Sequence, residues 1–308
     1  MSNYKDFLPS GSAAKLDEFT SSGTWTKPSG ATFVLVEAWG AGGGGGSGRR
    51  GATSTWRYGG AGGGGGAYAM RLFKASDLSA TVSVTIGAAG YGGSAQTSDD
   101  SSGIAGSPGG NSAFGSLLNA FGGSGGSRGE ATLGPFTPGG GVMYSNEPIA
   151  NIGTVATTLD IPGGFGSGYS YAANGAVSGK ALPSGWGGGS GGSGTYSPGA
   201  GSFQGGCGGG AGGSIQSGNF VVDGSAGGSP TSATGSGGAG GSSGANGTDG
   251  TNRSGGGGGG ASSTAAAGTG GAGGFPGGGG GGGGGSLNGF NSGAGGAGAK
   301  GLVRVYSW

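Results

Sequence analysis

The sequence predicts an all-β protein, in which N- and C-terminal strands form a small antiparallel β-sandwich and glycine-rich excursions pack as a polyglycine II bundle. Two observations lead to this prediction. Apolar runs with strand-like alternation lie near both ends of the chain, and glycine, 97 of 308 residues, dominates the sequence between them. Average proteins contain about 7% glycine, so this composition excludes an ordinary globular enzyme.

Unbroken glycine runs at 42–46, 255–260 and 277–285 exclude a collagen triple helix, which needs glycine at every third position and far more than the 11 prolines present. Elastic disorder is the alternative that composition alone favours, because glycine loses more conformational freedom on ordering than any other residue. Against it, 12 Phe, 9 Tyr and 5 Trp residues supply enough apolar surface for a modest core.

The clearest strand is expected at 32–39, after the turn sequence KPSG at 27–30, with a short strand at 24–26 before that turn. Phe33 and Leu35 share one face of the longer strand, and Val34 and Val36 share the other. Because both faces are apolar, this strand is expected inside a sheet with cover on both sides.

Further strands are expected where apolar residues alternate. Val82 and Val84 alternate with Thr and Ser in 80–86, which predicts a half-buried strand. The strand at 32–39 is expected to be the central member of a sandwich that the closing strand completes, because sheets need several strands to bury a face. The other strands are expected at 67–73, 112–114, 117–121 and, closing the chain, 301–308.

Polyglycine II has three residues per turn, rises about 3.1 Å per residue and makes no hydrogen bonds within one strand. Its backbone groups must therefore bond to neighbouring strands, which glycine permits because it has no Cβ. The run 277–285 would span about 28 Å in this form. Ordering each residue costs about 1–2 kcal/mol of backbone entropy, so several tracts must pack at once.

Composition divides the chain into five segments. Residues 1–18 carry the apolar residues Tyr4, Phe7, Leu8 and Pro9 and are interpreted either as a segment that attaches to a neighbouring protein or as a frayed terminus. The remaining segments are sandwich strands with the first glycine tracts at 19–134, a less glycine-rich insertion at 135–162, a polyglycine II-like region at 163–298 and the closing strand at 299–308.

Four stretches resemble glycine-rich bacteriophage tail and tail-fibre proteins: GTWTKPSGATFVLVEAWGAGGGGGSG at 23–48, ATVSVTIGAAGYGG at 80–93, GGNSAFGSLLNAFGG at 109–123 and GAKGLVRVYSW at 298–308. The resemblance brackets most of the chain. It implies a structural appendage or distal receptor-binding adhesin of a virion, in which loops between glycine strands contact the bacterial surface. It also implies a homo-oligomer, a trimer by analogy with tail fibres.

Several kinds of chemistry are not expected. The chain has no histidine, which removes histidine-based catalysis and histidine metal ligation, and its acids are scattered. The adjacent pair Asp99 and Asp100 is interpreted as a solvated loop, with a weak calcium ligand set as the alternative. Cys207, in GGCGGG, is interpreted as a small apolar filler rather than a reactive thiol. We therefore expect no enzymatic activity, no cofactor and no metal site.

Aromatic residues placed among glycines are the candidate receptor-binding residues, since exposed Trp, Tyr and Arg bind strongly at interfaces and stack on sugars. The alternative is that they cap the glycine bundle or pack against a neighbouring subunit. The candidates are Arg49, Arg50, Trp56, Arg57 and Tyr58 in one loop, and Tyr169, Tyr171, Trp186 and Tyr196 in later loops.

The expected function is therefore a non-enzymatic tail-fibre or tail-tip protein that recognises a host surface protein or glycan. A purely architectural virion component is the alternative, and an ice-binding protein is disfavoured because glycine spacing is aperiodic. Charges are balanced, with 13 basic and 12 acidic residues, so binding to nucleic acid or to a membrane surface through net charge is not expected. No apolar run approaches about 20 residues, so membrane insertion is not expected either. The N-terminus shows no signal-peptide pattern, and host lysis is the expected route by which virions reach the outside.

Overall fold

The computed structural model describes residues 14–132, 198–202, 204–229, 242–251 and 254–308. The strands in these ranges form two four-stranded antiparallel sheets and one short parallel pair. Helix η2 (Ala75–Asp77) is a single 3-10 turn. The described part of the chain is therefore all-β with antiparallel sheets, which confirms the predicted fold class at this level.

Sheet A has the strand order β1-β10-β3-β5 and contains both ends of the described chain. Strand β3 lies inside the sheet and pairs with β10 on one side, with Val36 opposite Val305. The strand expected at the centre of the sandwich thus lies inside sheet A, beside the closing strand β10. The strands of sheet A are β1 (Lys15–Phe19), β10 (Leu302–Ser307), β3 (Phe33–Trp39) and β5 (Tyr68–Lys74).

Sheet B has the order β2-β6-β7-β8, and its apolar side chains share one core with those of sheet A. Trp25 and Phe114 from sheet B meet edge to face, with ring centroids 5.5 Å apart, beside Val34 and Val303 from sheet A. All four side chains are almost fully buried. The strands of sheet B are β2 (Gly23–Thr26), β6 (Thr81–Thr85), β7 (Ser112–Phe114) and β8 (Leu118–Ala120).

Strand β1 was not predicted, and it crosses the expected boundary between residues 18 and 19. Its sequence, KLDEF, is largely polar and exposed because β1 is an edge strand of sheet A. It is held by the register with β10, in which Leu16 lies opposite Tyr306. Pairing with a distant strand, rather than local alternation, makes this segment a strand.

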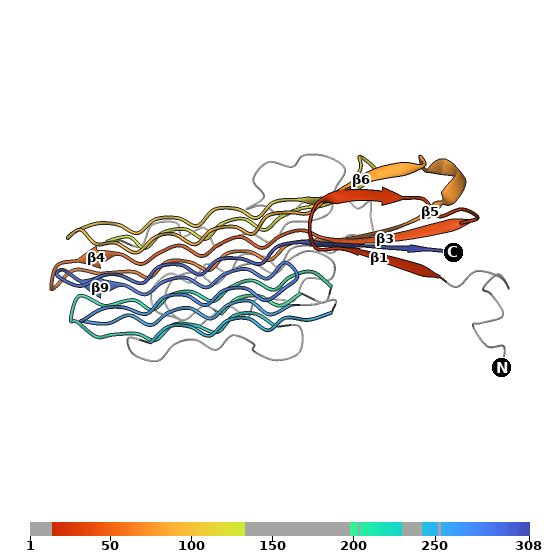
Figure 1. Cartoon of the computed structure of the whole chain (residues 1–308). Coiled ribbons are helices and arrows are strands. Elements are labelled where there is room, and N and C mark those ends of the chain that lie inside the picture. Colours follow the sequence, from red (N-terminus) through yellow and green to blue (C-terminus); the bar gives the residue numbers. More distant parts are fainter. Residues whose placement is uncertain (1–13, 133–197, 203, 230–241, 252–253) are drawn as a thin grey trace, which may run out of the picture.

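Extended glycine-rich tracts run side by side away from the sheets, and Figure 1 shows them as undulating traces that end near β4 (Arg50–Gly51) and β9 (Ser286–Leu287). Several tracts directly continue strands. Tract 40–51 follows β3 and tract 57–67 leads into β5, so the antiparallel pairing of β3 with β5 extends outward through the Gly40 N–H, which donates to Ala67 O at 2.9 Å. The sheets and this bundle are thus one continuous structure.

Hydrogen bonds from one tract to a given neighbouring tract recur at every third residue. In tract 40–51, Gly40, Gly43 and Gly46 donate to one neighbour, at the carbonyls of Ala67, Gly64 and Ala61. The N–H groups of residues 41, 44 and 47 donate to a second tract, and those of residues 42, 45 and 48 donate to a third. The carbonyl groups of the tract accept from three further tracts. Within the described residues this tract therefore has six bonded neighbours, namely 57–67, 87–96, 101–110, 121–130, 277–286 and 291–301.

Tract 277–286 occupies a second central position, also with six bonded neighbours among the described residues. A Cβ added at Gly281 would lie 2.1 Å from the carbonyl oxygen of Gly258, and one at Gly42 would lie 2.0 Å from that of Gly278. Real Cβ atoms do not approach this closely, so the backbones would have to separate. This close approach explains the unbroken glycine run at 277–285.

The tract 242–250 at the edge of the bundle bonds to its neighbour with side chains as well as backbone. Side-chain oxygens three residues apart, on Ser243, Asn246 and Asp249, accept from the backbone N–H groups of 269, 272 and 275 at 3.3, 2.9 and 2.7 Å. The adjacent Gly247 N–H donates to Ala272 O at 2.8 Å. Polar side chains with the same step of three thus act as acceptors at this edge.

Trp39, at the end of β3, joins sheet A to the second half of the bundle. Its ring packs 4.9 Å from that of Tyr68, and its indole N–H donates to the Gln204 carbonyl at 2.8 Å. The Arg304 guanidinium lies 5.4 Å from its ring centroid. Trp39 is fully buried, and Phe275 packs against the same cluster. This contact fixes tracts late in the sequence against the first long strand.

Candidate functional site

Figure 1 shows the end of the bundle farthest from the sheets. Among the described residues, five loops from distant parts of the sequence meet there. Short backbone bridges hold them together: β4 pairs with β9 in parallel, Arg50 bridges to Ser101, and Arg57 bridges to Ile215. We call these the tip loops, residues 51–57, 96–101, 215–222, 263–267 and 286–291.

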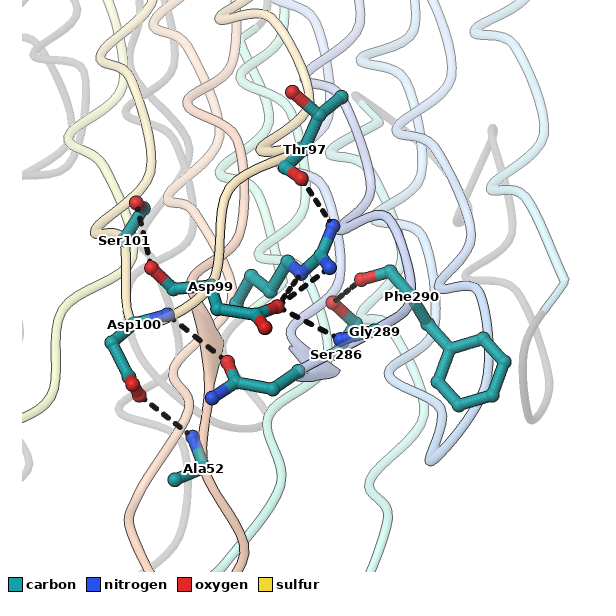
Figure 2. A network of polar contacts seen from close by, with 10 residues as sticks. Ala52, Thr97, Asp99, Asp100, Ser101, Ser286, Gly289 and Phe290 are labelled. Atoms are coloured by element: carbon teal, nitrogen blue, oxygen red, sulfur yellow. Dashed lines mark hydrogen bonds and ion pairs between the residues drawn. The ribbon is translucent and has the colours of Figure 1, made fainter.

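Arg50 organises one side of the tip. Its Nε and Nη2 atoms lie 2.7 and 2.6 Å from the same Asp99 carboxylate oxygen, and its Nη1 donates to Thr97 O at 2.5 Å (Figure 2). That oxygen also accepts from the Gly289 N–H at 2.9 Å. The Gly289 hydrogen bond, followed by that of Arg50, holds the pKa of Asp99 below its ordinary value. Asp99 is thus an ionised acceptor that joins loops 96–101 and 286–291 to strand β4.

Asp100, beside it, joins loop 96–101 to loops 51–57 and 286–291. Its carboxylate accepts from the Ala52 N–H at 3.1 Å, and its own N–H donates to the Asn288 side chain at 3.0 Å. Figure 2 shows Ala52 and Asp100 on neighbouring loops. Asp100 has φ +53°, a left-handed conformation in which Asn and Asp are enriched. The sequence predicted a solvated loop here, and both aspartates are exposed, but it did not predict these hydrogen bonds to other loops.

Arg57 organises the other side and is completely buried. Its guanidinium donates to Ala52 O, to Gln216 O at 3.0 Å and to the Asn219 side-chain oxygen at 2.8 Å. These acceptors are neutral, and burial, with a further contribution from Arg49, lowers the pKa of Arg57. Asn219 also has a positive φ, +62°. Arg57 therefore joins loops 51–57 and 215–222 from inside.

The remaining predicted residues of this loop lie at the side of the tip. The rings of Trp56 and Tyr58 stack with centroids 5.2 Å apart and planes 6° from parallel; Tyr58 is buried and Trp56 is partly exposed. Arg49 reaches Ser102, whose hydroxyl donates to Glu130 at 2.7 Å. Most polar groups of the loop are thus used within the protein.

The apolar residues that the tip exposes are different from the predicted ones. Phe220 is 71% exposed, Val221 47% and Phe290 46%. Each follows a turn sequence, SGN at 217–219 or NG at 288–289. That turn chemistry between glycine tracts is the signal that could have identified them, because it places the next bulky residue at a loop apex.

The other predicted site residues cannot be located. The candidates Tyr169, Tyr171, Trp186 and Tyr196, and the attachment candidates Tyr4, Phe7, Leu8 and Pro9, lie outside the described residues. The structure therefore brings together Arg49, Arg50, Trp56, Arg57 and Tyr58, and of these it exposes Trp56 and Arg49 in part.

Within the described ranges no cluster of three or more potential metal ligands occurs. Cys207 is fully buried; burial raises the pKa of its thiol to about 12, and its Sγ accepts from the Ser202 N–H at 3.3 Å. A thiol in this environment is a packing group. No helix of the described chain is long and apolar enough to cross a bilayer.

Among the described side chains of the tip, no arrangement that would activate a nucleophile is present. Its charged groups bond to neighbouring loops, while aromatic and aliphatic groups face solvent on a cross-linked frame. Comparison of the sequence with known proteins gave no matching family model and no matching curated sequence.

Proposed function

We propose that this chain is a non-enzymatic component of a bacteriophage tail fibre or tail tip, and that its tip loops recognise the host cell surface. The observation that carries the proposal is the exposure of Phe220, Val221 and Phe290 at the end of the molecule farthest from the sheets. Aromatic residues on a pre-ordered frame lose little entropy on binding. The four stretches that resemble tail proteins support the same assignment.

We further propose that the glycine tracts form a polyglycine II bundle. The support is the step of three residues between successive hydrogen bonds to the same neighbouring tract and the presence of six bonded neighbours around tracts 40–51 and 277–286. A threefold backbone repeat directs successive N–H groups toward three neighbours. Such a bundle would hold the tip loops at a fixed distance from the sheets.

The proposed partners are other virion proteins at the sheet end and a host surface protein or glycan at the tip. The location is then the virion, outside the cell after lysis. The trimer that the resemblance implies is tested by sedimentation equilibrium of the full chain, where a species of 27.9 kDa would contradict it.

Binding of the fluorescently labelled full chain to a panel of Gram-negative and Gram-positive cells tests the receptor role. For a strain that binds, we expect the double variant Phe220→Ser, Phe290→Ser to lose roughly thirty-fold in affinity, the effect of removing an interface anchor of about 2 kcal/mol. Leu72→Ser, at the opposite end, is the matched control. Binding unchanged by the double variant would refute the receptor role of the tip.

A purely architectural role is the second candidate, and the burial of Arg57 and Tyr58 favours it, since both side chains seal the bundle end. It predicts that no strain in the panel binds the isolated protein. It also predicts that the double variant adsorbs normally when assembled into virions, which separates the two functions.

A further inference from the structure

The face of sheet A turned away from the core is apolar and uncovered in the described structure. Leu16, Tyr306, Leu35 and Leu72 lie directly opposite one another across the four strands. Directly paired residues point to the same face of a sheet. Val36, the residue after Leu35, is fully buried in the core, so the side chains of this row point away from the core. Leu16 is 49% exposed and Leu72 56%.

The next rows on this face continue the apolar surface. Met70 is two residues from Leu72 and 44% exposed, and Phe33 is two residues from Leu35 and 39% exposed. The charged groups between these rows are already bonded: Arg304 Nε lies 2.8 Å from a Glu18 oxygen, and Glu37 accepts from Tyr68 and Tyr306. Lys74, opposite Phe33, is an exposed charged group at one end of the face. The face therefore needs an apolar cover rather than a charged one.

The size of the face indicates what kind of partner covers it. Large side chains offer about 150–250 Å² each, so Leu16, Phe33, Met70 and Leu72 leave on the order of 350 Å² open at these exposed fractions. A stable interface between two folded proteins needs about 800 Å² from each partner. A second copy would thus be held weakly here, whereas a short apolar segment fits the available area.

We propose that residues 1–13 of the same chain bind this outer face of sheet A, with Tyr4, Phe7 and Leu8 as the apolar contacts. These residues lie outside the described ranges, but their attachment point is fixed, since residue 14 precedes β1 and Leu16 belongs to the face. They also contain apolar side chains of the type that the face requires.

The chain is long enough for this contact. Phe7 is seven residues from residue 14 and can reach up to about 23 Å from it. Crossing the sheet from β1 to β5 takes three strand spacings, about 14 Å. Phe7 can therefore reach Leu72 on the far strand without strain. Because the tether keeps the segment close, modest contacts suffice to hold it.

Oxidation of Met70 tests the proposal in the full chain. With the face covered, hydrogen peroxide should convert Met70 to the sulfoxide several-fold more slowly in the wild type than in the variant Phe7→Ser, Leu8→Ser, as followed by peptide mass spectrometry. Phe290→Ser, which alters an exposed aromatic at the other end, is the control and should not change the rate. Equal Met70 rates in wild type and Phe7→Ser, Leu8→Ser would overturn the proposal, and would leave the tip function unaffected.

A disulfide trap identifies which chain supplies the segment. The variant Phe7→Cys, Leu72→Cys should form an intrachain disulfide in air, and Phe7→Cys, Phe290→Cys should not. The native Cys207 is buried and does not compete. A disulfide-linked dimer formed in place of the intrachain bond would assign the segment to a second copy and overturn the proposal as stated.

Discussion

Arg57 shows how a single buried side chain joins loops that are distant in sequence. Its guanidinium contacts Ala52, Gln216 and Asn219, and none of these acceptors carries a full negative charge. Burying a cation without a carboxylate is unfavourable unless its hydrogen bonds are satisfied. All three bonds come from the two terminal nitrogens, whereas the buried Nε has no hydrogen-bond partner among the described residues. The planar fork of donors at the end of arginine reaches all three acceptors at once, which explains why arginine occupies this position.

We predict that Arg57→Met lowers the free energy of unfolding by about 1–3 kcal/mol, because the Asn219 side-chain oxygen and the carbonyls of Ala52 and Gln216 lose their donor. Urea unfolding followed by tryptophan fluorescence measures the change. Arg128→Met is the control, since that arginine is 56% exposed and its pair with Glu130 contributes less than about 1 kcal/mol. Equal losses in the two variants would contradict the structural role of Arg57.

Asn246 gives a second prediction for one residue. Asn246→Ala should speed hydrogen exchange at the Ala272 amide and lower stability by about 0.5–1.5 kcal/mol, because that amide loses its acceptor. Asn246→Asp keeps an acceptor oxygen and should retain protection. If both variants exchange alike, the side chain is not the acceptor in solution.

Among the elements, the central glycine tracts are the least tolerant of substitution. We predict that Gly281→Ala lowers the free energy of unfolding by about 3 kcal/mol or more, because its Cβ would lie 2.1 Å from the Gly258 carbonyl oxygen and the tracts must separate. Gly23→Ala in β2 is the control, since the nearest atoms to its Cβ lie at 3.7 Å. Chemical denaturation measures both, and similar stabilities would contradict close packing of the tracts.

Strands in which apolar side chains alternate between the two faces could be predicted from the sequence. Which glycine tracts are hydrogen-bonded to one another could not. Burial of Val34 and Val36 on one face of β3 follows from the sequence pattern. Within 277–285, by contrast, no side chain distinguishes one glycine from the next, so the sequence carries no information on register. At the tip, too, the sequence does not show which distant segments meet. Composition indicated the loop that contains Arg57, but the packing of Arg57 inside the protein involves Asn219, which is far away in the sequence.

Tyr68, at the end of β5 next to the bundle, predicts how stability depends on pH. Burial, followed by the hydrogen bond to Glu37 at 2.6 Å, raises the pKa of Tyr68 far above its ordinary value of about 10. The folded state then retains a proton that the unfolded state releases, so the stabilisation is complete below pH 10 and declines as pH rises above it.

We therefore expect the free energy of unfolding to fall by up to about 1.4 kcal/mol per pH unit between pH 10 and 11.5 in the wild type. Tyr68→Phe should be less stable at pH 8, because the hydroxyl bond is lost, but should decline less steeply. Urea titrations at several pH values measure the slopes. Tyr91→Phe, which alters a side chain that is 79% exposed, should keep the wild-type slope, and identical slopes in all three proteins would contradict the prediction.

At the scale of the whole molecule, the sheets and the bundle share their backbone. Strand β3 passes directly into tract 40–51, and tract 291–301 passes directly into β10. The two sheets thereby fix where the first and last tracts begin, and Trp39 attaches the tracts between them. Glycine tracts, which have no side chains to set their register, thus obtain it from the strands.

This continuity predicts that sheets and bundle unfold together. Hydrogen exchange at rising urea concentrations should expose peptides from 33–39 and from 277–286 at the same midpoint, because a tract that leaves the bundle removes partners from six neighbours and gains backbone entropy of about 1–2 kcal/mol per residue. Shortening the chain by removing β10 should lower both midpoints equally. Loss of protection in 277–286 well before 33–39 would show instead that the bundle is an independent unit, and the tip would then be held by a support much weaker than the sheets.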